Sequence, residues 1–142
     1  MDTANNQPQQ QPPQQPSEQA PLPKVLIIED EYFISELYVR ALKKAGYEVT
    51  LAVDGQDGLH KALGNQYDII LLDIMVPTVT GNEILDQLQA HQPPIKAKVI
   101  ITTNLEQSEE IKEKLERQAD GYIIKAEITP KQLVDFLGQL SL

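Results

Sequence analysis

The chain has 142 residues, of which 41% are hydrophobic, and a formal net charge of -9. This size and composition predict one globular domain, and the acidic charge argues against direct nucleic-acid binding, which needs a basic surface. The absence of cysteine excludes a disulfide scaffold, a thiolate metal site and a cysteine nucleophile. No apolar run approaches the roughly 18 residues of a membrane span and no secretory signal is visible, so we expect a cytoplasmic protein without membrane insertion.

Residues 1–23 differ in composition from the rest of the chain. The segment contains seven Gln and six Pro and almost no apolar residues. A segment of this kind cannot bury enough surface to offset its ordering entropy. We therefore predict a disordered Gln/Pro-rich arm at 1–23, followed by a single domain at 24–142.

From residue 24 onward, strand and helix patterns alternate. In chain order they predict a strand at 25–28, a helix at 31–45, a strand at 48–52, a helix at 55–63 capped by Asp54, a strand at 68–72, a helix at 81–91, a strand at 98–101, a helix at 106–118, a strand at 121–124 and a last helix at 130–142. Five strand–helix units in series predict an α/β fold with a parallel sheet and helices on both faces.

Polar side chains stand at the carboxyl ends of these strands. They are Glu29, Asp30, Asp73, Thr103 and Lys125. In doubly wound sheets, ligands bind beyond the carboxyl ends of the strands, so we expect these residues to share one rim. Asp73 is the most informative of them, because a carboxylate after a buried apolar strand needs a partner.

The chemistry of such a rim is that of phosphate and a hard cation. Clustered carboxylates raise one another's pKa, and Mg²⁺ relieves their repulsion; Asp30 and Asp73 are the expected direct ligands, with Glu29 acting through water. A carboxylate can also act as a nucleophile and form an aspartyl phosphate. Lys125 would supply positive charge and Thr103 a hydroxyl donor, which is what phosphoryl transfer requires.

The chain from residue 24 onward resembles the receiver domain of bacterial two-component response regulators, in particular single-domain, chemotaxis-type receivers. The matching stretches are Val25-Leu26-Ile27-Ile28-Glu29-Asp30-Glu31, Asp54-Gly55, Leu71-Leu72-Asp73-Ile74-Met75-Val76-Pro77 with Gly81, Ile101-Thr102-Thr103, and Ala119-Asp120-Gly121-Tyr122-Ile123-Ile124-Lys125. The intervals are also typical of receivers: 103 − 73 = 30 residues to the threonine and 125 − 73 = 52 to the lysine. The resemblance implies a flavodoxin-like sheet with strand order 2-1-3-4-5 and five helices.

The resemblance also implies roles for the rim residues. Asp73 would be the phosphoacceptor, taking a phosphoryl group from a histidine kinase or a histidine phosphotransfer protein. Glu29 and Asp30 would be the acidic pair for Mg²⁺, with Met75 giving its backbone carbonyl. Lys125 would contact the phosphate. The protein would be a signalling switch rather than an enzyme with turnover.

Switching and docking residues follow from the same resemblance. Thr103 and Tyr122 would be the switch pair that passes phosphorylation on to an unidentified downstream protein through the fourth helix, fifth strand and fifth helix. Phe33 lies off the inward stripe of the first helix, so Phe33, Ile34 and Leu37 are a docking hypothesis for the phosphodonor.

Several alternatives stay open at this stage. Thr102 is adjacent to Thr103, and strand alternation alone does not choose between them. A pseudo-receiver would use the fold as a phosphorylation-independent binding module, and an aspartyl-phosphate phosphatase would share the chemistry but usually carries a second carboxylate where Met75 stands. Met75 and Leu105, together with Asn104, predict slow self-dephosphorylation.

Two further expectations concern the end of the chain. Ala126 follows Lys125 where many receivers have a proline after a cis bond, which leaves the loop geometry open. The last predicted helix reaches the end of the given sequence, which predicts a single-domain regulator that acts by protein contact; a piece of a longer regulator stays open as the alternative.

Overall fold

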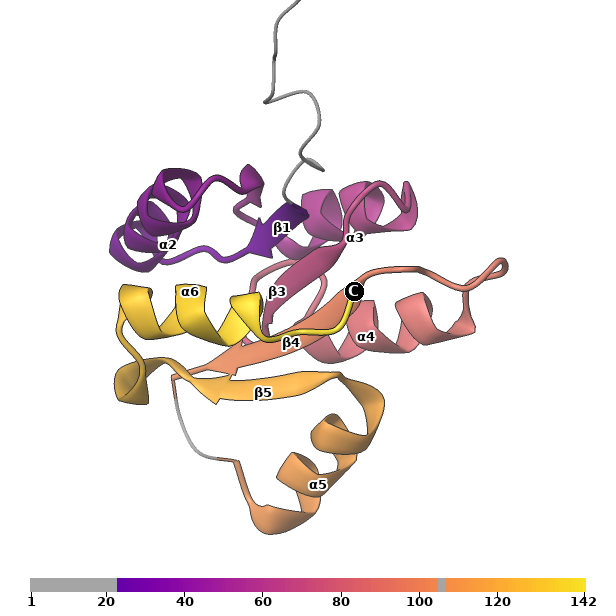
Figure 1. Ribbon diagram of the computed structural model, residues 1–142. Helices are drawn as coiled ribbons and strands as arrows, with labels where there is room; N and C mark the ends of the chain where they lie inside the picture. Colours follow the sequence, from indigo (N-terminus) through magenta and orange to yellow (C-terminus); the bar gives the residue numbers. More distant parts are fainter. Residues whose placement is uncertain (1–22, 105–106) are drawn as a thin grey trace, which may run out of the picture.

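The computed structural model describes residues 23–104 and 107–142, so most of the predicted arm, as well as Leu105, lies outside the described residues. A five-stranded parallel sheet with strand order β2-β1-β3-β4-β5 forms the centre of the molecule (Figure 1), and this confirms the predicted doubly wound topology. The strands are β1 (Lys24–Ile28), β2 (Glu48–Ala52), β3 (Ile69–Asp73), β4 (Lys98–Thr103) and β5 (Gly121–Ile124).

Five α-helices connect and follow the strands. They are α2 (Tyr32–Lys44), α3 (Gly55–Leu63), α4 (Gly81–Ala90), α5 (Glu109–Gln118) and α6 (Pro130–Gly138). Two helix ends differ from the sequence prediction by more than one residue. Helix α5 begins after Ser108, whose hydroxyl accepts a hydrogen bond from the Ile111 amide and caps the helix there. Helix α6 stops at Gly138 rather than at the end of the chain, since glycine is a poor helix former.

Two strands end at later residues than the sequence predicted, and both ends carry candidate site residues. Strand β3 includes Asp73 itself, and β4 runs two residues further than predicted, to Thr103. A short 3₁₀ turn, η2 (Lys125–Glu127), follows β5 directly and was not predicted. Asp73 and Thr103 are therefore the last residues of their strands, whereas Glu29 and Asp30 directly follow β1 and Lys125 directly follows β5.

Side chains of the strands alternate between two cores, one on each face of the sheet. The core on the α2/α6 face contains Val25, Ile27, Tyr38, Leu42, Ile69, Leu71, Ile100, Ile123, Leu133 and Leu137. The core on the α3/α4/α5 face includes Leu26, Ile28, Ile70, Leu72, Ile101, Ala62, Ile84, Leu85, Leu88 and Leu115. Because both faces are covered, the inner strands β1, β3 and β4 contain continuous apolar runs instead of alternating ones.

The segment after Asp73 is held against the start of α3. The Gly55 amide donates to the Pro77 carbonyl at 2.8 Å. A Cβ on Gly55 would lie 1.7 Å from the Val79 carbonyl oxygen, and a Cβ on Gly81 would lie 2.6 Å from the carbonyl oxygen of Asp73. Both glycines are therefore required by close backbone contact, which fixes the path of the chain as it leaves Asp73.

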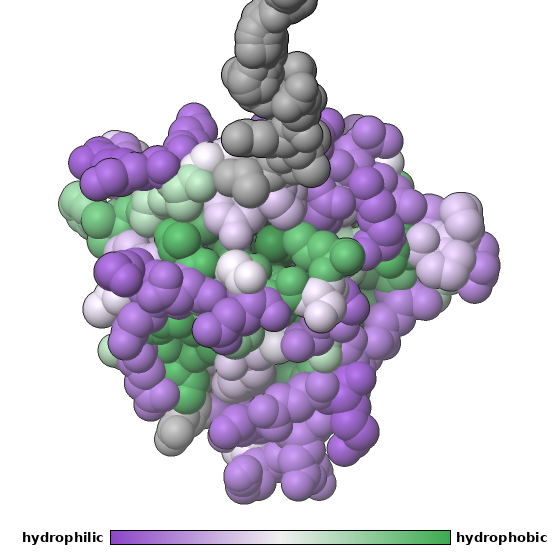
Figure 2. All heavy atoms as spheres, in the orientation of Figure 1, coloured by the Kyte–Doolittle hydropathy of each residue, from purple (hydrophilic) through white to green (hydrophobic). Residues whose placement is uncertain are grey.

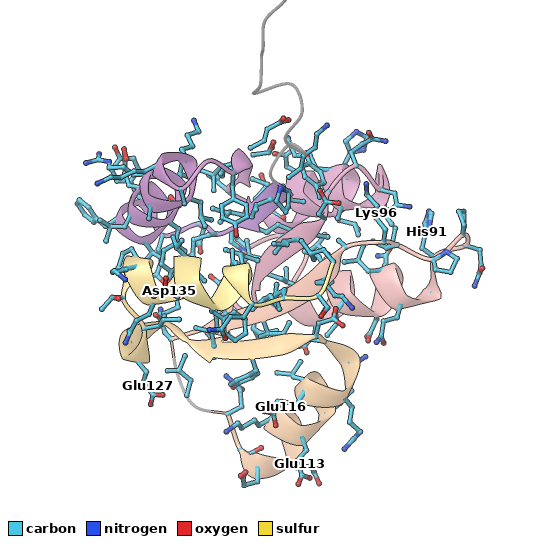
Figure 3. The ribbon with its side chains drawn as sticks, viewed as in Figure 1. His91, Lys96, Glu113, Glu116, Glu127 and Asp135 are labelled. Carbon is cyan, nitrogen blue, oxygen red and sulfur yellow. The ribbon has the colours of Figure 1, made fainter. Side chains whose placement is uncertain are left out.

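The surface is mostly polar. Figure 2 shows polar side chains over α5 and α6 and apolar ones in the furrow between α6 and β5. Figure 3 shows Glu113 and Glu116 on α5 and Glu127 in η2, just after β5. His91 and Lys96 lie in the segment between α4 and β4. Within the described part of the chain, no helix is both long and apolar enough to cross a bilayer.

Candidate functional site

Glu29, Asp73 and Lys125 lie at the carboxyl ends of three different strands and converge at one end of the sheet. Each stands two residues after a side chain of the α2/α6 core on its own strand. Because side chains alternate along a strand, this spacing directs all three toward the same side of the rim. Glu29 and Asp73 are also neighbours across the sheet, since β1 and β3 pair in register up to the residues just before them.

The Lys125 ammonium lies among three carboxylates. Its Nζ is 2.7 Å from Glu29 Oε1, 3.2 Å from Asp73 Oδ2 and 3.2 Å from Glu31 Oε2. The side chains of Lys125, Glu29 and Asp73 are at most 2% exposed. Burial alone would lower the pKa of the Lys125 ammonium, but Glu29, Asp73 and Glu31 outweigh burial and raise it. The site therefore contains a permanently charged, nearly dehydrated cation next to Asp73.

The carboxylates form a group that suits a divalent cation. Glu29, Asp30 and Asp73 each offer an oxygen, and these oxygens lie within 4.8 Å of one another. Burial raises the pKa of the Glu29 carboxyl to about 7, although Lys125 acts in the opposite direction. Hard cations such as Mg²⁺ take oxygen ligands, and a cation here would relieve the repulsion among the acids. The donor set fits Mg²⁺.

Glu31 belongs to this site and was missed as a site residue by the sequence reasoning. It occupies the N-cap position of α2, and its carboxylate accepts hydrogen bonds from Lys125 Nζ at 3.2 Å and from Asn104 Nδ2 at 2.5 Å. Burial would raise the pKa of the Glu31 carboxyl, but these two donors outweigh burial and lower it. The available signal was the run Glu29-Asp30-Glu31, in which the third acid also sits at a strand end.

Met75 lies at the mouth of the site. Its backbone amide donates to Asp73 Oδ1 at 3.0 Å, and its side chain is 71% exposed. The amide contact holds one carboxylate oxygen of Asp73 while Lys125 contacts the other. The metal-binding role of the Met75 carbonyl stays a prediction.

The two threonines at the end of β4 face opposite ways. Thr102 is the register partner of Asp73, while Thr103 pairs with Ile124, the residue before Lys125. Both are buried, and Gln107 donates to the Thr103 hydroxyl at 3.5 Å. Strand alternation places Thr102 on the α2/α6 side with Asp73 and Thr103 on the other side. The assignment of Thr103 still rests on the spacing and stays a prediction.

Tyr122 packs on the same face as Thr103. Its ring lies against the α3/α4/α5 core, with Lys112 Nζ 5.7 Å from the ring centroid. Its hydroxyl is buried, and among the described residues it has no hydrogen-bond partner. Residues Thr103 and Tyr122 are thus on one face of adjacent strands, an arrangement compatible with the predicted switch pair.

The sequence model of the response regulator receiver domain family matches residues 25–137. The chain belongs to this family. The match lies inside the predicted 24–142 domain and covers all five strands of the sheet except the first residue of β1.

Curated relatives and solved structures agree with this membership. Response regulator ArlR of Staphylococcus saprophyticus is 40% identical over 103 residues, which are 72% of this chain and 45% of the relative; ArlR of Staphylococcus aureus is 38% identical over the same length. The chain thus spans less than half the length of these relatives.

Two solved receivers have the same fold. A CheY-like receiver domain from Methanospirillum hungatei matches with a TM-score of 0.73 and 29% identity, covering 83% of this chain and 92% of that one. Chemotaxis protein CheY4 of Vibrio cholerae matches with a TM-score of 0.73 and 28% identity, covering 84% and 99%. The protein is therefore a response regulator receiver of two-component signalling, a family whose members bind Mg²⁺ at an acidic pocket.

The receiver's first helix carries the predicted docking residues. Phe33 is 80% exposed and Leu37 is 49% exposed, whereas Ile34 is partly buried and packs against the α2/α6 core. The exposure of Phe33 and Leu37 is compatible with the docking hypothesis, which stays a prediction. Tyr32 was not predicted; it is 67% exposed and its ring packs edge-on against Phe33 at 5.5 Å.

The backbone shows the conformation of the peptide bond between Lys125 and Ala126, in the loop after β5. Among the described residues the cis peptide bond is Gln92–Pro93, so the Lys125–Ala126 bond is trans. The chain turns directly into η2 at Lys125. Lys125 therefore reaches the site from the start of a tight turn.

Proposed function

We propose that this receiver accepts a phosphoryl group on Asp73 from a phosphohistidine donor and relays it as a change in protein contacts. The observation that carries the proposal is the buried Asp73 carboxylate held 3.2 Å from the Lys125 ammonium, beside a carboxylate group that suits Mg²⁺. One carboxylate oxygen of Asp73 attacks the phosphorus as the P–N bond to histidine breaks. The bonding electrons return to the imidazole, which takes up a proton from solvent.

The chain's own residues divide the work. Glu29, Asp30 and Asp73, with the Met75 carbonyl, would hold Mg²⁺, which when bound neutralises charge on the phosphoryl oxygens. Lys125 stabilises negative charge on the transferred group, since it already stands beside the acceptor oxygen. The amide of Met75 keeps the carboxylate oriented.

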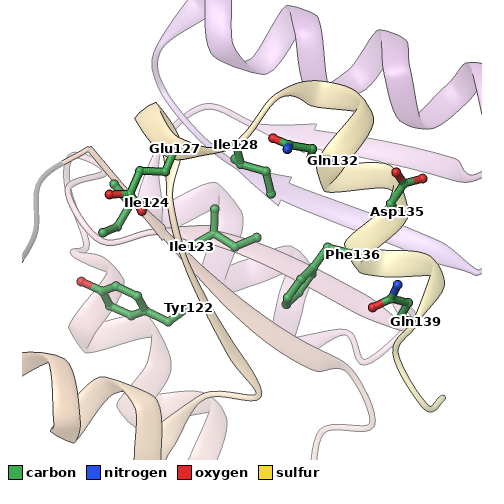
Figure 4. Close-up of a pocket in the computed structure, with 9 residues that line it drawn as sticks. All are labelled: Tyr122, Ile123, Ile124, Glu127, Ile128, Gln132, Asp135, Phe136 and Gln139. Atoms are coloured by element: carbon green, nitrogen blue, oxygen red, sulfur yellow. The ribbon is translucent and has the colours of Figure 1, made fainter.

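The proposed readout passes through the face formed by α5, β5 and α6. Thr103 would bond the phosphoryl group, and Tyr122 would respond on the neighbouring strand. A groove of about 470 Å³ runs along β5 and α6 and is lined by residues that include Tyr122, Ile124, Ile128 and Phe136 (Figure 4). A downstream protein that docks there would sense a change at the end of β5.

The proposed donor surface lies on the first turns of α2. Tyr32, Phe33 and Leu37 form an exposed apolar patch directly after Glu31, the residue that contacts Lys125. A histidine kinase or histidine phosphotransfer protein that covered this patch would bring its phosphohistidine to the adjacent rim.

The expected lifetime of the phosphoryl group on Asp73 depends on the side chain of Met75, which lies beside the acceptor. Met75 is apolar and exposed beside Asp73, so it offers no side chain to orient a hydrolytic water. We therefore propose slow self-dephosphorylation, with a lifetime well above seconds in the isolated protein. The predicted contribution of Leu105 falls outside the described residues.

The proposal is tested with acetyl phosphate, or beryllofluoride, plus Mg²⁺ on wild type and Asp73→Asn. Wild type should form an adduct that requires both Mg²⁺ and Asp73. An absent adduct would instead favour a phosphorylation-independent binding module. Many turnovers on a phosphate ester would favour a phosphatase, a reading that Met75 opposes because it supplies no second carboxylate.

A further inference from the structure

Glu31 and Asn104 join two loops across the outer side of Lys125. Glu31 follows β1 and Asn104 follows β4, and the Asn104 amide donates to the same Glu31 oxygen, Oε2, that accepts from Lys125 Nζ. The Glu31 side chain is 43% exposed, whereas those of Glu29 and Asp73 are 2% exposed. Glu31 is thus the carboxylate partner of Lys125 that lies nearest the solvent.

In this arrangement the Lys125 ammonium, which would stabilise an incoming phosphoryl group, is already paired with carboxylates. The lysine has three donor hydrogens, and three carboxylates lie within 3.2 Å of its nitrogen. Glu29 and Asp73 belong to the proposed metal group, so a bound Mg²⁺ would neutralise part of their charge in addition to Lys125. Glu31 is outside that group. An entering dianionic phosphoryl group must therefore displace Glu31 from Lys125 or approach against its charge.

We propose that Glu31 is a positioning residue that withholds Lys125 from small phosphodonors, and that Asn104 anchors it in that role. The inference rests on the proposed function, since it concerns the rate of Asp73 phosphorylation. Glu31 acts through Lys125 rather than on the reacting atoms. Its place at the N-cap of α2, directly before the exposed Tyr32 and Phe33, links it to the surface where a protein donor would dock.

The expected size of the effect is moderate. A partly exposed ion pair contributes up to about 1 kcal/mol, which corresponds to about a fivefold change in rate if it must be broken before transfer. Asn104 holds the carboxylate but does not contact Lys125 in any hydrogen bond of the described residues. Its removal should therefore have a smaller effect of the same sign, and only while Glu31 is present.

The test measures the second-order rate constant for phosphorylation by acetyl phosphate at saturating Mg²⁺. Glu31→Gln keeps the side-chain size and removes the charge, and it should react about fivefold faster than wild type. The matched control is Glu36→Gln, which removes the same charge from a similarly exposed side chain of the same helix and should stay within twofold. Asn104→Ala should react about twofold to threefold faster, and Glu31→Gln/Asn104→Ala should match Glu31→Gln alone.

The outcomes separate this inference from the proposed function. If wild type forms no Asp73-dependent adduct, the proposed function itself fails. If wild type reacts but Glu31→Gln is no faster than Glu36→Gln, only the inference is overturned. Additive effects of the two substitutions would show that Asn104 does not act through Glu31. Should Glu31→Gln fold poorly by circular dichroism, an unchanged rate in Asn104→Ala overturns the inference independently.

Discussion

Replacing Lys125 by Met should make the fold strongly dependent on pH and on divalent cations. The ammonium is 2.7 Å from Glu29 and 3.2 Å from Asp73. At an effective dielectric constant of about 20, these two contacts correspond to gross attractions of about 6 and 5 kcal/mol. Most of that offsets the dehydration of the charges. Removing one partner of a buried pair costs about 3–5 kcal/mol net, because the remaining carboxylates stay buried without a counter-charge.

The sign of the pH effect follows from Glu29. Its pKa in the folded protein is already raised to about 7, and it should rise further without Lys125, whereas the unfolded value is near 4.3. A carboxyl with a raised folded pKa contributes stability that is complete below the unfolded pKa and is lost as the pH rises through the folded pKa. The deficit of Lys125→Met should therefore be small near pH 5 and large at pH 8.

Urea unfolding with EDTA at pH 5.5 and pH 8 measures this deficit. With an m-value of about 2 kcal/mol/M, the midpoint of Lys125→Met should fall by about 2 M at pH 8, and Mg²⁺ should restore part of it. The control is Lys61→Met, which breaks the surface pair with Asp57 and should cost less than about 1 kcal/mol at either pH. A Lys125→Met deficit that is equal at both pH values, or no larger than that of the control, would refute the reasoning.

Three further predictions concern the backbone contact, the hydroxyl and the docking patch. Gly55→Ala should destabilise the protein by about 2 kcal/mol in urea unfolding, because a Cβ there would overlap a backbone carbonyl. The control Gly138→Ala should not destabilise it, because a Cβ there meets no neighbour within 4 Å. Equal effects of the two substitutions would contradict the steric argument. Thr103→Val should weaken beryllofluoride binding about tenfold, as expected for a lost hydrogen bond to a charged group, and Thr102→Val should change it less than threefold; the reverse order would move the assignment to Thr102. Phe33→Ala should slow phosphotransfer from the cognate phosphohistidine protein and leave the acetyl phosphate rate unchanged, and a donor-independent effect would remove the docking role.

The alternation of apolar runs and amphipathic segments determined the fold class. Residues 69–72 of β3 are all apolar and buried, and this pattern has one common solution, a parallel sheet covered on both faces. Parallel strands bring all their carboxyl ends to one edge, so the meeting of Glu29, Asp73 and Lys125 could be predicted from their positions alone. Local signals also placed several helix ends correctly, including the Asp54 cap and the Gly64 end of α3.

What the sequence left open depended on contacts between distant segments. From the sequence, Glu31 was one more acid in a run of three. Only the approach of the segments after β1, β4 and β5 gave it Asn104 and Lys125 as partners. Leu37 follows Ile34 at the apolar spacing of its helix, but the placement of α2 on the sheet leaves it 49% exposed. Periodicity indicates which residues share a helix face, whereas the elements that pack against the helix determine which of these residues are buried. The sequence by itself therefore determined the topology and the acidic rim, and the tertiary structure decided which carboxylates share the Lys125 charge, since that depends on distances across the sheet.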